Sequence, residues 1–300
     1  MDRQSWFLLV FLALLWGGSF FFVEVALSHW PTLTLVFLRV FFGAAALGGY
    51  LLVTRIPVPF DPSLWGAFAV MGLLNNVIPF SLIVFGQTGL ESGTAAILNA
   101  TTPLFTVAVA HALTGDEKAK LHKLVGVVFG ILGVGVLAGP EAARGLGGAL
   151  VYQVAILGAA LSYSVAAVFG RRFGTVPPPV TAFGMLLAST MVMAPAAFFV
   201  DEWPSLAMPA FDVGSLPGAY GTVITLGIAC TALAYLIYFR LLARAGATNL
   251  MLVTFLVPPG AMALGIIFLG ELPTVWTLVG FALIACGLLA VDGRLYPSKR

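Results

Sequence analysis

Polar side chains set within long apolar stretches are the residues of this chain best placed to do chemistry. Gly72, Asn75, Asn76 and Pro79 recur at i, i+3, i+4 and i+7, so they share one face of a helix predicted over residues 63–85. Two amides beside a proline, which frees a backbone carbonyl, can hold the polar part of a small molecule. A lone asparagine often only hydrogen-bonds a neighbouring helix, but two adjacent amides favour a face that lines a cavity.

Other apolar stretches add hydroxyls and aromatic rings at helical spacing. Threonines can instead bond a carbonyl of their own helix, and aromatic residues at this spacing often only pack. Apolar walls with a few convergent polar groups are nevertheless typical of a small-molecule pocket. The residues predicted to bind the substrate are Trp16, Ser19, Asn75, Asn76, Asn99, Thr102, Ser162, Tyr163, Thr231, Tyr235 and Tyr238.

Charged residues inside the apolar stretches are scarce. Glu24 and Arg39 fall in the outer third of two neighbouring stretches, so we expect them to pair and close an external gate. The alternative is that Glu24 is interfacial and Arg39 extends its long side chain to the surface. Pro79, Pro103 and Pro258 complete the predicted gating set, because prolines within helices remove hydrogen bonds and bend them.

Several kinds of chemistry have no support in the sequence. It contains no G-x-x-x-x-G-K-[ST], H-E-x-x-H or G-x-S-x-G motif. His29, His111 and His122 are scattered over different depths, and Cys230 and Cys286 lie in apolar stretches. We therefore expect no catalytic residue, metal or cofactor, and a protein that is not an enzyme. No carboxylate lies at mid-stretch to relay protons, which favours facilitated diffusion or exchange, with coupling through His111 as an alternative.

The elements that must position these residues are membrane-spanning helices. The chain is 60% hydrophobic and only 9% charged over 300 residues, whereas about a quarter of a soluble chain is charged. A helix needs about 20 apolar residues to cross the hydrocarbon layer. Ten stretches meet this requirement, at approximately 5–27, 32–53, 63–85, 92–113, 121–139, 146–170, 178–200, 215–241, 247–269 and 274–291.

The basic residues predict the orientation of these spans, because loops rich in Lys and Arg stay in the cytoplasm. With the N-terminus inside, twelve of the 14 basic residues face inward: Arg3, Arg55, Lys118, Lys120, Lys123, Arg171, Arg172, Arg240, Arg244, Arg294, Lys299 and Arg300. We therefore predict a multi-pass protein of the cytoplasmic membrane with both termini in the cytoplasm.

The chain also repeats itself. Five residues of the first half, Pro103, Glu117, Gly126, Gly133 and Gly139, recur in the second half as Pro258, Glu271, Gly280, Gly287 and Gly293. Because each repeat holds five spans, an odd number, the second must be inverted relative to the first. Inverted repeats are characteristic of secondary transporters, which alternate access around a central site.

The predicted fold is an all-α membrane protein of ten helices in two inverted repeats around a central cavity, with repeats at residues 1–140 and 146–293 and a cytoplasmic tail at 294–300. The fifth and tenth spans carry glycines and few polar groups, which predicts a scaffold.

Four motifs distributed over nearly the whole chain carry a family resemblance. They are Trp16-Gly17-Gly18-Ser19-Phe20, Leu38-Arg39, the run from Gly93 to Pro103, and Leu269-Gly270-Glu271. The chain resembles EamA-type members of the drug/metabolite transporter superfamily and is most similar to YddG-like amino-acid exporters. The resemblance implies export of neutral and aromatic amino acids, although Arg39 has no basic counterpart in the seventh span.

Apolar walls discriminate weakly between substrates, so we expect broad specificity. The expected partners are a small-molecule substrate and the lipid bilayer, without nucleic acid, in a monomer or weak homodimer. The alternatives are a carrier of a hydrophobic drug or lipid-linked sugar and, less favoured, an intramembrane enzyme.

Overall fold

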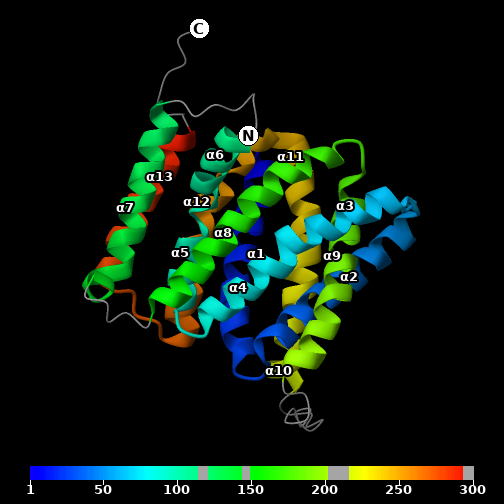
Figure 1. Cartoon of the computed structure of the whole chain (residues 1–300), viewed down its shortest axis with the longest axis horizontal. Coiled ribbons are helices and arrows are strands. Elements are labelled where there is room, and N and C mark those ends of the chain that lie inside the picture. The colour runs from blue at the N-terminus through cyan, green and yellow to red at the C-terminus, as the bar shows by residue number, and fades with distance from the viewer. Residues whose placement is uncertain (114–120, 144–148, 202–215, 293–300) are drawn as a thin grey trace.

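The computed structural model describes residues 1–113, 121–143, 149–201 and 216–292, and within these ranges the chain is built from helices and short connections, without a strand (Figure 1). The α-helices are α1 (Arg3–Leu27), α2 (Thr32–Thr54), α3 (Pro62–Gly72), α4 (Ile78–Gln87), α5 (Ser92–Asn99), α6 (Thr102–Leu113), α7 (Leu121–Ala143), α8 (Leu150–Phe169), α9 (Pro178–Val200), α10 (Leu216–Gly227), α11 (Ala234–Leu250), α12 (Val253–Leu264) and α13 (Val275–Asp292). Shorter segments continue some of them: the π-helices η1 (Leu73–Val77), η4 (Ile228–Leu233) and η5 (Gly265–Leu269), and the 3₁₀ helix η2 (Gly170–Phe173).

These helices form the ten predicted spans. Eight described helical stretches are long and apolar enough to cross a membrane, and the stretches Val253–Leu269 and Val275–Val291 are shorter but also apolar. The ninth span begins later than predicted because α11 continues to Leu250 across a kink at Gly246, whose φ of 78° suits glycine. The fold class is therefore the predicted one, with shifted boundaries.

Some predicted features lie outside the described residues. They are Glu117 and Gly293 of the repeat, the tail 294–300, and the basic residues Lys118, Lys120, Arg144, Arg294, Lys299 and Arg300.

The two repeats meet in a pseudo-two-fold arrangement, which is clearest where α7 packs against α13 at one edge of the molecule (Figure 1). A Cβ added to Gly126 would lie 2.6 Å from the carbonyl oxygen of Gly287, and one added to Gly133 would lie 2.8 Å from that of Gly280. Gly126 corresponds to Gly280 in the sequence repeat, and Gly133 corresponds to Gly287. Each contact is therefore the image of the other, as expected for repeats related by a two-fold axis.

The same symmetry places two of the three described π-helical segments, η1 and η4. Segment η1 follows Gly72 and η4 follows Gly227. A Cβ on Gly72 would lie 2.6 Å from the carbonyl oxygen of Met185, and one on Gly227 would lie 2.9 Å from that of Arg39. Arg39 in α2 and Met185 in α9 are thus equivalent positions, so the repeat places a thioether where the first half has a guanidinium.

The bends expected at Pro103 and Pro258 differ between the repeats. The fourth span is interrupted at Ala100 and Thr101, directly before Pro103 in the first turn of α6. By contrast, α12 stays helical through Pro258, and its next irregularity is η5. The N–H groups in the first turn of a helix have no intrahelical partner, so Pro103 at the start of α6 removes no hydrogen bond. Pro258 lies inside the continuous helix α12, where it does remove one.

Contacts between the repeats fasten both ends of the molecule. At the end that carries the N-terminus, Arg244 of α11 forms an ion pair of 2.8 Å with Asp2, the N-cap residue of α1. At the opposite end, which we call the distal face, Glu271 accepts hydrogen bonds from the backbone N–H groups of Ser92 (2.8 Å) and Gly93 (3.2 Å). The second contact gives the Leu-Gly-Glu motif a structural role, because it caps the N-terminus of α5 from the other repeat.

Candidate functional site

The two predicted amides lie in η1, and they meet the second repeat there. Asn75 donates from Nδ2 to the hydroxyl of Tyr235 (2.9 Å), and Asn76 donates from Nδ2 to Ser189 Oγ (3.1 Å). Tyr235 in turn donates to Asn76 Oδ1 (3.2 Å). One tyrosine therefore joins both asparagines across the boundary between the repeats.

The π-helical geometry explains how a neighbouring helix reaches this network. A π-helix shifts the hydrogen-bond register, and such segments are frequent at functional sites. Ser162 of α8 donates to the carbonyl oxygen of Leu74 in η1 at 2.7 Å. On the symmetric side, Thr231 in η4 donates to the carbonyl of Leu226 (2.7 Å). In the first repeat a side chain thus satisfies a carbonyl of η1, and in the second a side chain of η4 satisfies a carbonyl at the end of α10.

Arg39 lies in the interior and does not contact Glu24. Its side chain is 6% exposed, its Nε donates to Thr231 Oγ1 (3.1 Å), and its guanidinium carbon lies 3.8 Å from the centroid of the Phe80 ring. Glu24 instead accepts a hydrogen bond from Gln87 Nε2 (3.3 Å). Among the described ion pairs there is none between Glu24 and Arg39, so the predicted pair is wrong for this conformation: Glu24 lies toward the distal face and Arg39 turns toward η4.

The polar residues of the fourth span contribute mainly one free acceptor. Thr102 donates to the carbonyl of Asn99 (2.7 Å), and Thr106 donates to the carbonyl of Thr102 (2.9 Å). These are the backbone bonds considered as the alternative for both threonines. The Oδ1 atom of Asn99 is buried and has no hydrogen-bond partner, so it remains available to a donor.

Aromatic side chains connect these groups to the first span. The rings of Trp16 and Tyr238 lie 5.7 Å apart, and Tyr163 packs against both of the large apolar clusters of the molecule. Ser19 is buried in α1. The structure thus brings Asn75, Asn76 and Tyr235 into direct contact, places Thr231 on Arg39, and pairs Trp16 with Tyr238.

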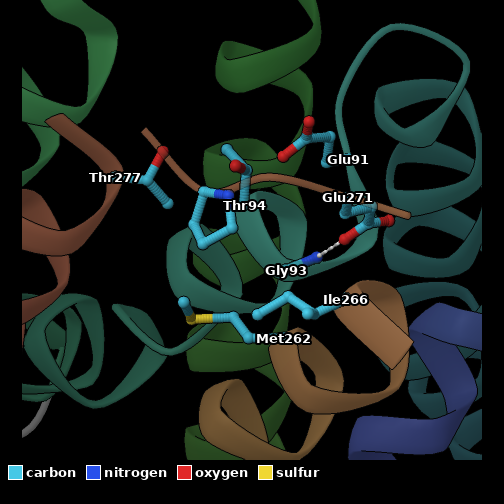
Figure 2. A pocket seen from close by; sticks show the side chains of 8 residues that line it. Glu91, Gly93, Thr94, Met262, Ile266, Glu271 and Thr277 are labelled. Carbon is cyan, nitrogen blue, oxygen red and sulfur yellow. Dashed lines mark hydrogen bonds between the residues drawn. The ribbon is translucent and has the colours of Figure 1, made fainter. Parts of the chain in front are cut away.

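An open cleft with a volume of about 630 Å³ lies at the distal face. Its lining includes Glu24, Gln87, Glu91 and Glu271. A pocket beside it, lined by Thr94 and Met262 among others, is shown in Figure 2, where Glu271 points at the backbone nitrogen of Gly93. Burial and the neighbouring Glu271 raise the pKa of Glu91 above its usual range.

Sequence reasoning missed several of the partners. Ser189, Met185 and Phe80 hold predicted site residues, yet as ordinary residues of apolar helices they carry no signal of their own. For Glu271 a signal existed, since its recurrence with Glu117 marked it as part of the repeat. Within the described ranges, no group of His, Cys, Asp and Glu residues is arranged to hold a metal ion.

Comparisons with known proteins agree with this architecture. The family model described as the EamA-like transporter family matches residues 4–139 and 150–291. The chain is 26% identical to a probable terminal-alkyne amino-acid exporter of Streptantibioticus cattleyicolor, covering 100% of this chain and 97% of the relative. It is 28% identical to a probable amino-acid metabolite efflux pump of Salmonella typhimurium, covering 96% and 94%. It is also 28% identical to the inner membrane transporter YedA of Escherichia coli, covering 96% and 91%. A crystal structure with 20% identity shares the fold, with a TM-score of 0.68 over 100% of both chains.

Proposed function

Because the chain belongs to the EamA-like transporter family, it is a multi-pass membrane transporter of small molecules, and we propose that it exports neutral and aromatic amino acids from the cytoplasm. Two relatives are named as an amino-acid exporter and an amino-acid metabolite efflux pump, which supports this class of cargo. The transporter acts as a secondary carrier by alternating access.

The observation that carries the proposal is the network of Asn75, Asn76 and Tyr235. Its members come from both repeats, and in inverted-repeat carriers the substrate sits between the repeats. Polar groups inside a bilayer are costly and mark substrate pathways. A network of amides and a hydroxyl offers hydrogen-bond donors and acceptors without burying a charge in the membrane. Such a network suits a small polar solute.

The remaining groups suit the ammonium group and the side chain of a neutral amino acid. The free acceptor Oδ1 of Asn99 matches an ammonium donor, while Trp16, Tyr163 and Tyr238 provide apolar and aromatic surface. A methylene in such a pocket changes binding by only about 1–3 kcal/mol. Several neutral or aromatic amino acids should therefore compete with similar affinity.

Alternating access requires that the repeats move relative to each other. The proposed moving parts are the irregular segments: η1 and η4 beside the network, and the break before Pro103. The Glu271 cap and the Asp2–Arg244 ion pair lie at opposite ends. Each can open while the other stays closed, which is what a carrier with one central site needs.

A competition experiment tests the cargo. The purified full-length protein in liposomes should take up labelled L-phenylalanine, and unlabelled neutral and aromatic amino acids should inhibit it with similar potency. A hydrophobic dye or a lipid-linked sugar, added at the same concentration, should not inhibit. Uptake of the dye or the lipid-linked sugar without uptake of any amino acid would replace the proposed cargo with that alternative.

A further inference from the structure

Arg39 is a buried cation whose charge the described structure does not neutralise. It lies two turns into α2 and is 6% exposed. A guanidinium remains protonated in proteins. Within a membrane span an unpaired charge of this kind is expensive, and such residues normally face a partner or a polar pathway. The burial of Arg39 therefore indicates a functional role for its charge.

The contacts of Arg39 leave one edge of the guanidinium free. Phe80 covers one face at 3.8 Å, which is a cation–π contact. The Nε atom donates to Thr231 Oγ1 at 3.1 Å, and this is the hydrogen bond that the described structure gives the side chain. The four N–H groups of the two terminal nitrogens are thus available, in the planar geometry that matches a carboxylate bidentately.

Two acidic residues of the described structure that lie on or beside the helices around Arg39 have other hydrogen-bond partners. Asp201 accepts from the backbone nitrogen (2.7 Å) and the hydroxyl (2.6 Å) of Thr34, at the start of α2. Glu24 accepts from Gln87. The titratable groups that interact electrostatically with Arg39 are the side chains of Tyr163, Cys230 and Tyr235, and none of them is a carboxylate.

Arg39 lies close to the network described above, because its hydrogen-bond partner Thr231 is four residues before Tyr235 in the chain. Tyr235 accepts from Asn75 and donates to Asn76, and Tyr163 packs against both apolar clusters. The equivalent position in the second repeat holds Met185, whose sulfur lies 3.8 Å from Asn75 Nδ2. Of these two equivalent positions, only the one in the first repeat thus carries a cation.

We propose that Arg39 binds the carboxylate of the transported solute through its terminal nitrogens. The inference rests on the proposed function for the identity of that solute as an amino acid, but it requires only a carboxylate. It assigns the binding preference to a carboxylate-bearing small molecule and removes Arg39 from the external gate.

The test measures binding to the solubilised full-length protein as the ligand-dependent rise of its thermal unfolding midpoint. The probes are L-phenylalanine, 3-phenylpropionate, which lacks the ammonium group, and L-phenylalaninamide, which lacks the carboxylate. The wild-type protein should bind both carboxylates more tightly than the amide. Arg39→Gln should weaken binding of the carboxylates by about ten-fold to hundred-fold and leave binding of the amide unchanged.

Two further variants sharpen the result. Arg39→Lys keeps the charge but not the bidentate geometry, so it should retain part of the carboxylate preference. Arg55→Gln makes the same substitution at the exposed end of α2 and should match the wild type. Should Arg39→Gln not fold, the wild-type preference and Arg39→Lys decide the question.

The outcomes separate this inference from the proposed function. Arg39-dependent binding of 3-phenylpropionate without binding of L-phenylalanine supports the inference and contradicts amino-acid export. Equal affinity of the wild type for L-phenylalanine and its amide, or binding of neither carboxylate, overturns the inference. Equal weakening of all three ligands in Arg39→Gln also overturns it, because that pattern indicates a structural role.

Discussion

The side chains of Asn75 and Asn76 hydrogen-bond to Tyr235 and Ser189 of the opposite repeat, at the boundary where the proposed site lies. Asn75→Ala, Asn76→Ala and Asn99→Ala should each weaken the apparent affinity for amino acids by about five-fold to hundred-fold, because a polar group of the bound substrate is left without its hydrogen-bond partner at a cost of about 1–3 kcal/mol. Flux in liposomes after a check of folding and insertion measures this.

A matched control for these variants is Asn249→Ala. Asn249 lies at the C-terminal end of α11 and is not among the residues of the proposed site, so its removal should leave affinity unchanged. If the three site variants all keep the wild-type affinity, the amides do not contact the substrate.

At the residue scale, the sequence located polar groups but not their partners. Helical spacing predicted a common face for Asn75 and Asn76, and both contact Tyr235 in the structure. The same reasoning placed Glu24 and Arg39 at similar depths. Depth along a helix does not determine which way the helix turns its side chains toward its neighbours. The direction of Arg39 toward Thr231 depends on how α2 packs against η4, which no local pattern encodes.

Glycines at the contact of α7 and α13 allow a test at the scale of elements. Gly126→Ala would bring a methyl group to 2.6 Å from the backbone of Gly287, and overpacking of this kind costs about 1–3 kcal/mol. We expect a lower thermal unfolding midpoint in detergent. Gly135→Ala on the same helix meets nothing within 4 Å and should be neutral or slightly stabilising, because alanine favours a helix more than glycine does. Equal midpoints of the two variants would contradict the packing described.

The carboxylates of the distal face give a second prediction for the elements. Glu271→Ala removes the cap of α5 and should lower stability by about 1–3 kcal/mol, measured by thermal unfolding at neutral pH.

Glu91→Gln should instead raise the stability of the folded protein at neutral pH. Burial and Glu271 raise the pKa of Glu91, so the folded state favours its protonated form, and the stability linked to that form is lost as pH rises through the folded pKa.

The pH dependence of Glu91→Gln provides the control. Its stabilising effect should be present at neutral pH and disappear below about pH 4, the ordinary range of a glutamate pKa, because both states are then protonated in the wild type. An effect that is independent of pH would show that the charge of Glu91 is not the cause.

Among the elements, the apolar stretches correctly predicted ten spans because length and hydrophobicity alone define them. The π-helical segments η1 and η4 were not predicted. A π-helix needs about one residue more per turn than the surrounding helix and leaves no composition signal. Each of these two segments directly follows a glycine that packs closely against the opposite repeat, Gly72 or Gly227.

For the whole molecule, the proposed orientation places both termini in the cytoplasm. A cysteine introduced at Ser298 should be protected from a membrane-impermeant reagent in intact cells, whereas one at Ser205 should react. The parent protein should carry Cys286→Ala, because Cys286 is exposed while Cys230 is buried. Reaction at position 298 but not at 205 would invert the orientation.

The central claim is that two inverted repeats carry one amino-acid site that opens to each side in turn. Counterflow tests it most directly: liposomes that contain the purified protein and are loaded with unlabelled L-phenylalanine are diluted into a trace of labelled L-phenylalanine. The account predicts transient accumulation of label above its external concentration, and a reduced effect in Asn76→Ala. No accumulation above protein-free liposomes, with a folded and inserted protein and with L-phenylalanine or any other neutral amino acid, would contradict it.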